Sequence, residues 1–197
     1  MISVGNNFFY IKRVPCFLWF FDKGKAEELR DKVLFINARN YYTIVDSTLN
    51  EWDECQPKNM NAIVWLYRGE IDKYKKLLEE YKSTVEVMII EVGEEELKAV
   101  IDDVFGLGIE VVKKHLKSVR EAEKKAVEEA ARKDKKQVQN NWDEKIAAIE
   151  EIVEVVKEVH WLYSKFGVGE YEDILGLCKI TDIETIEGKG RSLTPSF

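Results

Sequence analysis

The sequence predicts an α+β protein that is mostly α, with a small antiparallel β pair and a long antiparallel helical hairpin of the coiled-coil type. Aromatic and β-branched runs fill the first 40 residues, which is typical of strands. From Ile109 to Phe166 the chain has neither Gly nor Pro and is rich in Glu, Lys and Ala. Hydrophobic residues make up 45% of the 197 residues and charged residues 34%, which is the profile of a soluble, charge-rich helical protein.

The β part is predicted from three runs near the N-terminus, "NNFFYIKR", "VPCFLWFF" and "KVLFINAR". The last two are strongly apolar, and strands that are apolar on both faces normally lie in the middle of a sheet. Two such strands cannot bury both of their faces alone. We therefore expect the N-terminal portion to be the edge of a larger sheet whose other strands lie outside this chain.

Residues 41–82 are predicted to be helical, because apolar residues of "NAIVWLYRGEIDKYKKLLEEY" recur at helical spacing. These residues are Ile63, Leu66, Tyr67, Ile71, Tyr74, Leu77 and Leu78. Gly69 is either tolerated inside this helix or ends it. The following run "TVEVMIIEV" fits two structures, since its β-branched residues favour a strand and its charged helical flanks favour a helix.

A heptad seam predicts the second helix of the hairpin. Its apolar and aromatic positions alternate at spacings of four and three: Trp142, Ile146, Ile149, Val153, Val156, His160 and Tyr163. The first helix carries a looser stripe through Val112, Leu116, Val119 and Ala126. Between them lies the polar stretch "ARKDKKQVQNN". Asn141 with Glu144 three residues later has the pattern of a helix N-cap, so the turn is predicted near Asp134–Asn141.

The charge of the hairpin differs from that of the whole chain. The chain has a formal net charge of −7, which argues against a surface that binds nucleic acid or anionic membranes as a whole. Ile109 to Gln137, however, holds ten Lys and Arg residues against six Asp and Glu residues, a net of +4. This excess is explained either by a solvated helix face or by a contact with the DNA backbone.

No catalytic or metal-binding constellation is found in the sequence. Cys16, Cys55 and Cys178 are scattered and give neither a disulfide framework nor metal-ligand spacing, which favours a reducing cytoplasm. His115 and His160 lie on helical stripes and are expected to be half-buried helix residues. The N-terminal apolar run is too short for a bilayer, which requires about 20 apolar residues. We therefore expect no metal site, no catalytic residue and no membrane contact in this chain.

The C-terminal stretch "GEYEDILGLCKITDIETIEGKGRSLTP" resembles the signature that ends the modification (M) subunits of type I restriction-modification systems. The matching positions are Tyr171, Asp173, Gly176–Lys179, Thr181, Glu184 to Ile186, and Leu193–Pro195. The segments "VPCFLWFFDKGK", "KVLFINARNYYTIVDSTLNEW" and "NAIVWLYRGE" look like those that follow the catalytic motif in the same subunits, and they come in the same order.

The resemblance implies an S-adenosylmethionine-dependent adenine-N6 DNA methyltransferase as the parent protein. The family's Asn-Pro-Pro-Phe/Tyr motif and its Gly-rich cofactor loop are absent here, and both would lie upstream of residue 1. We therefore expect a C-terminal part of an M subunit that is inactive alone and holds no cofactor itself. The expected domains are 1–82, the end of a methyltransferase-like domain with its late strand pair; 83–166, the helical hairpin; and 167–197, the signature segment.

Phe9 is the residue for which the resemblance implies a contact with substrate. In adenine-N6 methyltransferases an aromatic residue just before the late strand pair stacks on the flipped-out base. The stretch "FYIKRVP" places Phe9 at this position, with Phe8 or Tyr10 as alternatives if the register slips. The competing interpretation is that all three are ordinary strand or edge aromatics.

The expected partners are the specificity and restriction subunits of a type I complex, or the missing part of the M subunit, with DNA contacted through the complex. Ile146, Ile149, Val153 and Val156 are the candidate residues for packing on the specificity subunit. Alternatively, the same seam packs on the first helix of this chain. A second hypothesis is a stand-alone, truncated M-like regulatory protein, and a third is an autonomous enzyme.

Overall fold

The computed structural model describes residues 1–9, 14–191 and 193 of the chain. It contains two compact units, which we describe separately. Unit 1 comprises Met1–Lys75 and Val168–Phe197, and unit 2 comprises Lys76–Gly167. The expected fold class, α+β and mostly α, is confirmed.

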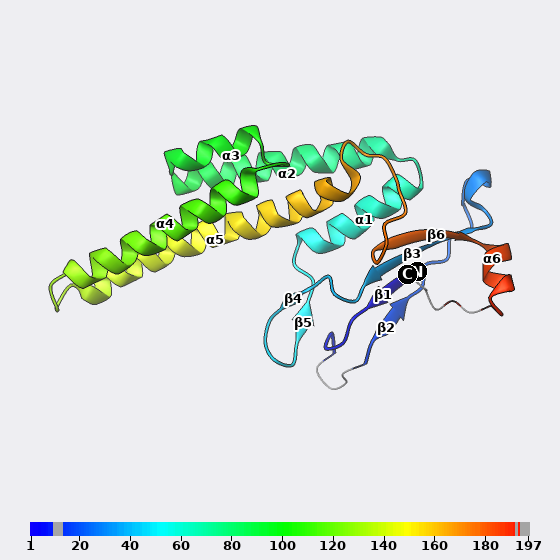
Figure 1. The fold of residues 1–197 in the computed structure, drawn as a ribbon, viewed down its shortest axis with the longest axis horizontal. Coiled ribbons are helices and arrows are strands. Elements are labelled where there is room, and N and C mark those ends of the chain that lie inside the picture. The colour runs from blue at the N-terminus through cyan, green and yellow to red at the C-terminus, as the bar shows by residue number, and fades with distance from the viewer. Residues whose placement is uncertain (10–13, 192, 194–197) are drawn as a thin grey trace. The chain divides into compact units, whose positions relative to one another are not determined.

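Unit 1 is built on a four-stranded mixed sheet of order β2-β1-β3-β6 (Figure 1). β1 (Ile2–Val4) pairs antiparallel with β2 (Cys16–Leu18) and parallel with β3 (Lys32–Ala38), and β3 pairs antiparallel with β6 (Cys178–Asp182). The two apolar runs predicted to form a strand pair, now β2 and β3, are therefore not neighbours. β1 separates them, since it is fully buried and takes the interior position. A short 3₁₀ helix, η1 (Glu27–Leu29), lies between β2 and β3.

The stretch predicted to be helical over 41–82 is a β-hairpin followed by two helices. β4 (Thr43–Ile44) pairs with β5 (Asn50–Glu51), and the Asp46 carboxylate accepts hydrogen bonds from the backbone N–H groups of Thr48 and Leu49 in the turn between them. A side chain that bonds its own backbone in this way competes with helix formation. The helical prediction for the first residues of this stretch was therefore wrong.

Helix α1 (Cys55–Tyr67) has reciprocal caps at its start. The Asp53 carboxylate accepts hydrogen bonds from the N–H groups of Cys55 and Gln56, while the Gln56 side chain accepts one from the Asp53 N–H. This is the capping-box arrangement, with Gln in the place of Glu. α1 packs against β3, and its Tyr67 hydroxyl donates to the Lys32 carbonyl oxygen at 3.2 Å.

Gly69 ends α1 rather than being absorbed into a longer helix. It has φ +73°, its N–H bonds to the Leu66 carbonyl, and the Glu70 N–H bonds to the Trp65 carbonyl at 2.8 Å. This pair of bonds is the Schellman motif that a left-handed glycine allows. α2 (Ile71–Val92) begins just beyond and continues through "TVEVMIIEV", which is therefore helical and not a strand.

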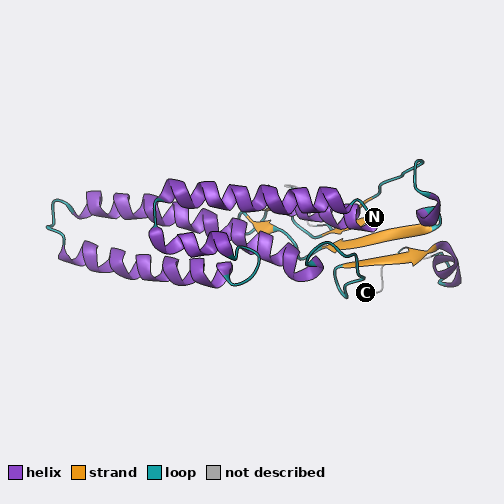
Figure 2. Cartoon of the chain, turned by 90° about the horizontal axis from the view of Figure 1, so that it is seen from above, coloured by secondary structure: helices purple, strands orange, loops and turns teal. Residues whose placement is uncertain are grey.

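Unit 2 holds most of α2, the 3₁₀ helix η2 (Glu95–Leu97), α3 (Lys98–Asp102), α4 (Gly108–Glu129) and α5 (Lys135–Phe166). α4 and α5 lie side by side as an antiparallel hairpin, and their connection lies beyond the ends of α2 and α3 (Figures 1 and 2). The predicted helical hairpin is thus confirmed.

The turn of the hairpin is earlier than predicted. α4 ends where Ala130 adopts an extended backbone with ψ 142°, and α5 begins at Lys135. Asn141 is therefore an interior helix residue and not an N-cap. Its side-chain oxygen accepts a hydrogen bond from Gln137 one turn earlier, a pairing that stabilises a helix surface.

The C-terminal segment contributes to the sheet of unit 1. β6 lies along β3 from Cys178 opposite Ile36 to Asp182 opposite Lys32. α6 (Ile183–Gly188) follows directly, with the Asp182 carboxylate accepting from the Thr185 N–H at its start. In the structure, the boundaries between the units lie between residues 75 and 76 and between residues 167 and 168. The sequence predicted these boundaries between 82 and 83 and between 166 and 167. The last segment belongs to the same unit as the first.

Candidate functional site

A run of exposed apolar side chains in unit 1 follows strand β2. We call residues 14–21 the aromatic edge. Its exposed large side chains, with the exposed fraction of each, are Val14 48%, Phe17 45%, Leu18 37%, Trp19 50%, Phe20 70% and Phe21 88%. The rings of Trp19 and Phe21 stack with centroids 6.3 Å apart. Scattered exposed apolar residues are ordinary, but six exposed apolar side chains within eight consecutive residues are typical of an interaction surface.

The position of β2 in the sheet explains why this surface is open. β2 lies at one end of the strand order, so within the described residues its outer backbone groups face no other strand. β1 beside it is fully buried, and Leu34, Phe35 and Ile36 of β3 are buried on both faces of the sheet. β2 thus has the composition of an interior strand but the exposure of an edge strand. Such an edge accepts a further strand or a covering element.

The loop after β1 holds Phe9, the base-stacking candidate. The backbone oxygens of Asn6 and Asn7 accept hydrogen bonds from the side chain and the N–H of Asn50, at 2.9 and 2.8 Å, which holds these two residues against β5. Phe8 packs inward against Trp52, with ring centroids 5.1 Å apart, and edge-on against Tyr42.

Phe9 is 51% exposed, whereas Phe8 is half-buried. Of these two aromatics, the structure therefore presents only Phe9 to a ligand. Tyr10, the other alternative of the sequence analysis, lies outside the described residues.

The predicted interface residues on α5 divide into two groups. Ile149 and Val156 are fully buried, whereas Ile146 and Val153 are half-buried. The buried stripe of α5 runs along a set of positions that only partly overlaps the predicted seam: Ile149, Ile152, Val156, Val159, Leu162 and Phe166. Ile149 and Val156 are thus covered by other parts of this chain, whereas Ile146 and Val153 keep part of their surface open.

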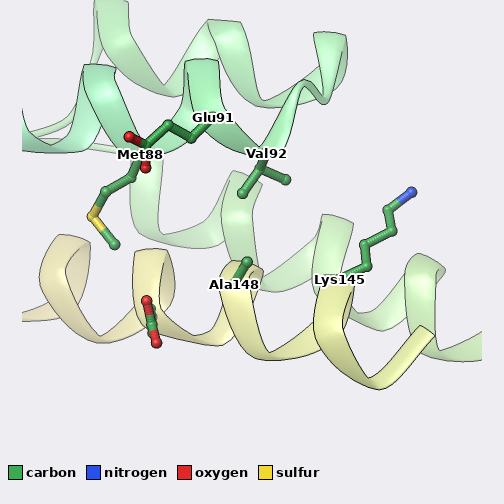
Figure 3. A pocket seen from close by; sticks show the side chains of 6 residues that line it. Met88, Glu91, Val92, Lys145 and Ala148 are labelled. Carbon is green, nitrogen blue, oxygen red and sulfur yellow. The ribbon is translucent and has the colours of Figure 1, made fainter. Parts of the chain in front are cut away.

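A groove between α2 and α5 lies on unit 2 and has a volume of about 400 Å³. Met88 and Val92 extend from α2 toward α5, which carries Ala148 and Lys145 (Figure 3). Glu91 and Glu151 complete the lining. Val87 and Ile90 on α2 are 53% and 64% exposed, so apolar side chains also lie outside the groove. The sequence patterns did not predict this surface, because they indicate no helix partner for α2.

One cluster of unit 2 has the residue types of a metal site. Ligand atoms of Glu94, Glu96 and His115 lie within 4.8 Å of one another. However, Lys145 Nζ lies 2.6 Å from one oxygen of Glu94, and His115 Nε2 lies 3.1 Å from the other. The hydrogen bond from Lys145 holds the pKa of Glu94 below its usual value. Since an ammonium group already balances the carboxylate, we assign the cluster to an ion-pair network that ties η2 to α4 and α5.

Cys178 has the environment of a structural thiol. It is fully buried, and burial raises its pKa, so the thiol form is favoured over the reactive thiolate. Burial likewise raises the pKa of Tyr171, whose hydroxyl donates to Asp173 at 3.1 Å. The same Asp173 oxygen accepts from the Ile180 N–H at 2.9 Å. These signature residues therefore hold the chain before β6 against that strand.

Comparison with known proteins identifies the family. Residues 1–102 match the model of the N-6 DNA methylase family. This match covers more than half of the 197 residues, so the chain belongs to that family. Comparison with curated proteins and with solved structures gives no match. In the described part of the chain, no helix is both long enough and apolar enough to cross a membrane.

Proposed function

We propose that this chain is the C-terminal part of the modification subunit of a type I restriction-modification system and that it acts through assembly. Its partners are the catalytic part of the methyltransferase and the specificity subunit, with the restriction subunit joining the complete complex. The observation that carries the proposal is the aromatic edge, an interior-type strand left open at the end of a sheet in a member of the N-6 DNA methylase family.

In this proposal S-adenosylmethionine and the target adenine's amino group bind to the partner part, since the sequence has neither a Gly-rich cofactor loop nor an Asn-Pro-Pro-Phe/Tyr motif. Phe9 stacks on the extruded adenine, because it is an open aromatic side chain close in the chain to Asn6 and Asn7, which β5 holds. The site of action is the cytoplasm, where the chromosome is methylated.

Co-expression with the N-terminal part of a type I M subunit tests the assembly. The chain should co-purify with that part, and the Phe20→Ser/Phe21→Ser variant should not, although its thermal unfolding is unchanged because both side chains are solvent-exposed. Equal recovery of the variant would contradict the proposal. In the assembled enzyme, Phe9→Ala should lower methylation of a DNA duplex and Phe9→Trp should retain it.

The docking of the specificity subunit is tested separately. Ile146→Glu and Val153→Glu should each weaken co-purification with a type I specificity subunit while the helicity measured by circular dichroism is kept. Ala147→Glu is the matched control, because Ala147 is exposed on the same helix. If all three variants bind the specificity subunit as well as the parent does, the seam serves internal packing alone.

The second candidate is a stand-alone M-like regulatory protein without enzymatic activity. Both candidates predict no methyl transfer by the isolated chain when it is incubated with labelled S-adenosylmethionine and DNA. A complete M gene beside the one that encodes this chain would favour the regulatory protein, and an in-frame upstream continuation would favour the fragment.

A further inference from the structure

The connection between α4 and α5 carries a concentrated positive charge. We call Ala131–Gln137 the hairpin tip. Its seven side chains are all exposed, and they include Arg132, Lys133, Lys135 and Lys136 against the single acid Asp134. The tip therefore has a net charge of +3 in a chain whose overall charge is −7.

The four cations of the tip form no ion pair among the described residues, and Glu128 and Glu129 are the acids that lie just before the tip. By contrast, Lys73, Lys98, Lys113 and Lys157 on other helix surfaces each pair with a glutamate. Lys135 and Lys136 occupy the first turn of α5, where the positive end of the helix dipole disfavours cations. The tip thus keeps its net charge of +3, which the two glutamates before it reduce to +1 over residues 128–137.

The residue types of the tip indicate which class of ligand it can bind. Protein interfaces are built around apolar or aromatic cores, and the only apolar side chain of the tip is Ala131. Single-stranded nucleic acids are held by aromatic stacking, and the tip has no aromatic residue. Lys and Arg without such neighbours are suited to the phosphates of a duplex, which carries one negative charge per roughly 1.7 Å of its axis.

The surroundings of the hairpin tip leave it accessible to a nucleic-acid duplex. The tip lies beyond the ends of α2 and α3 in both views (Figures 1 and 2), so these helices do not cover it. Surface charges farther away than a Debye length of about 10 Å at 0.1 M salt are largely screened, which limits repulsion by acidic residues elsewhere.

We propose that the hairpin tip binds the phosphate backbone of a nucleic-acid duplex without reading its sequence. This site lies outside residues 1–102, the part matched by the family model, and it does not depend on the proposed assembly. Arg132, Lys133, Lys135 and Lys136 each contact phosphate oxygens.

Fluorescence anisotropy of a labelled 20-base-pair DNA duplex with the full chain tests this site. A sequence-independent contact of about four phosphates gives micromolar affinity and a log–log salt slope near −3 to −4. The variant Arg132→Gln/Lys133→Gln/Lys135→Gln/Lys136→Gln should bind at least tenfold more weakly at 50 mM salt, with a much shallower slope. A second duplex of unrelated sequence should bind equally well.

The control variant removes the same charge from exposed lysines elsewhere: Lys23→Gln/Lys75→Gln/Lys76→Gln/Lys179→Gln. It should keep most of the affinity and the salt slope. The proposal is overturned if the two variants lose affinity equally, if the tip variant binds like the parent, or if the parent does not bind at low salt. Competition by poly-glutamate as efficient as that by unlabelled duplex would assign the tip to an acidic protein instead.

Discussion

At the scale of single residues, Glu94 shows how one carboxylate connects three elements. It lies just before η2, with one oxygen 2.6 Å from Lys145 Nζ of α5 and the other 3.1 Å from His115 Nε2 of α4. The Glu94 side chain exposes 19% of its surface, so these contacts are less screened than those of a surface pair. No sequence pattern indicates this role, because the three residues are distant in the chain and share no motif.

We expect Glu94→Gln to lower the free energy of unfolding by about 1.5 kcal/mol at pH 7, the low end of the range for hydrogen bonds to charged groups. Because the pKa of Glu94 is lowered in the folded state, its contribution is present above the unfolded-state pKa near 4.5 and is lost as the pH falls below it. Urea unfolding at several pH values measures this dependence.

Glu95→Gln is the matched control for this variant, since Glu95 forms an exposed ion pair with Lys98. Exposed pairs contribute little, so its unfolding free energy should change by less than about 0.5 kcal/mol. A difference between Glu94→Gln and the parent that stays constant from pH 7 to pH 3 would contradict the assigned role of the Glu94 carboxylate.

Gly5 is the second residue with a specific structural requirement. A Cβ atom there would lie 2.4 Å from the Arg39 carbonyl oxygen, so the loop that carries Phe9 needs glycine to approach the end of β3. Gly5→Ala should destabilise the chain by about 1–3 kcal/mol, as overpacking does. In Gly188→Ala the new Cβ meets no atom within 4 Å, and thermal unfolding should show no loss.

At the scale of elements, α5 shows why a heptad pattern is an incomplete guide. The seam predicted Ile149 and Val156 in contact positions, and both are fully buried. Yet Ile152 and Val159, outside that seam, are also fully buried, whereas Val153 is not. An α-helix has 3.6 residues per turn, so a straight helix drifts away from a strict seven-residue repeat. A helix covered from more than one side therefore buries a wider stripe.

Truncation of these side chains distinguishes the two kinds of position. Ile149→Ala should cost about 3 kcal/mol of unfolding free energy, because it leaves a cavity in a packed interior. Ile146→Ala should cost less than half as much, since Ile146 is only half-buried. Chemical denaturation followed by circular dichroism measures both, and equal losses would show that the seam is buried along its whole length.

At the scale of the whole molecule, unit 1 joins the two ends of the chain. β6 comes after all of unit 2 in the sequence and still pairs with β3 along five residue pairs. Cys178 on β6 is fully buried, and the Asn37 N–H bonds to the Leu177 carbonyl oxygen at 2.7 Å. The C-terminal segment is therefore part of the sheet and not an appended tail.

Removal of residues 168–197 should destabilise unit 1, because β3 loses an antiparallel partner and its buried Leu34, Phe35 and Ile36 lose cover. Limited proteolysis with mass spectrometry should show faster cleavage within 1–75 while the helices of 76–167 stay protected. Removal of 189–197 alone leaves β6 and α6 intact and should cause no such change. Equal protection of 1–75 in both truncations would contradict this role of β6.

The sequence by itself determined the helical hairpin, the mostly α fold class and the family, because helical periodicity and family segments are local patterns. It also predicts Phe9 as the base-stacking residue, and the structure shows this side chain exposed. Only the tertiary structure decided the sheet order, the β4–β5 hairpin and the Glu94 network. It alone showed that the aromatic edge is uncovered and that the C-terminal signature completes the first unit's sheet. These features depend on contacts between residues far apart in the chain, which local sequence patterns do not encode.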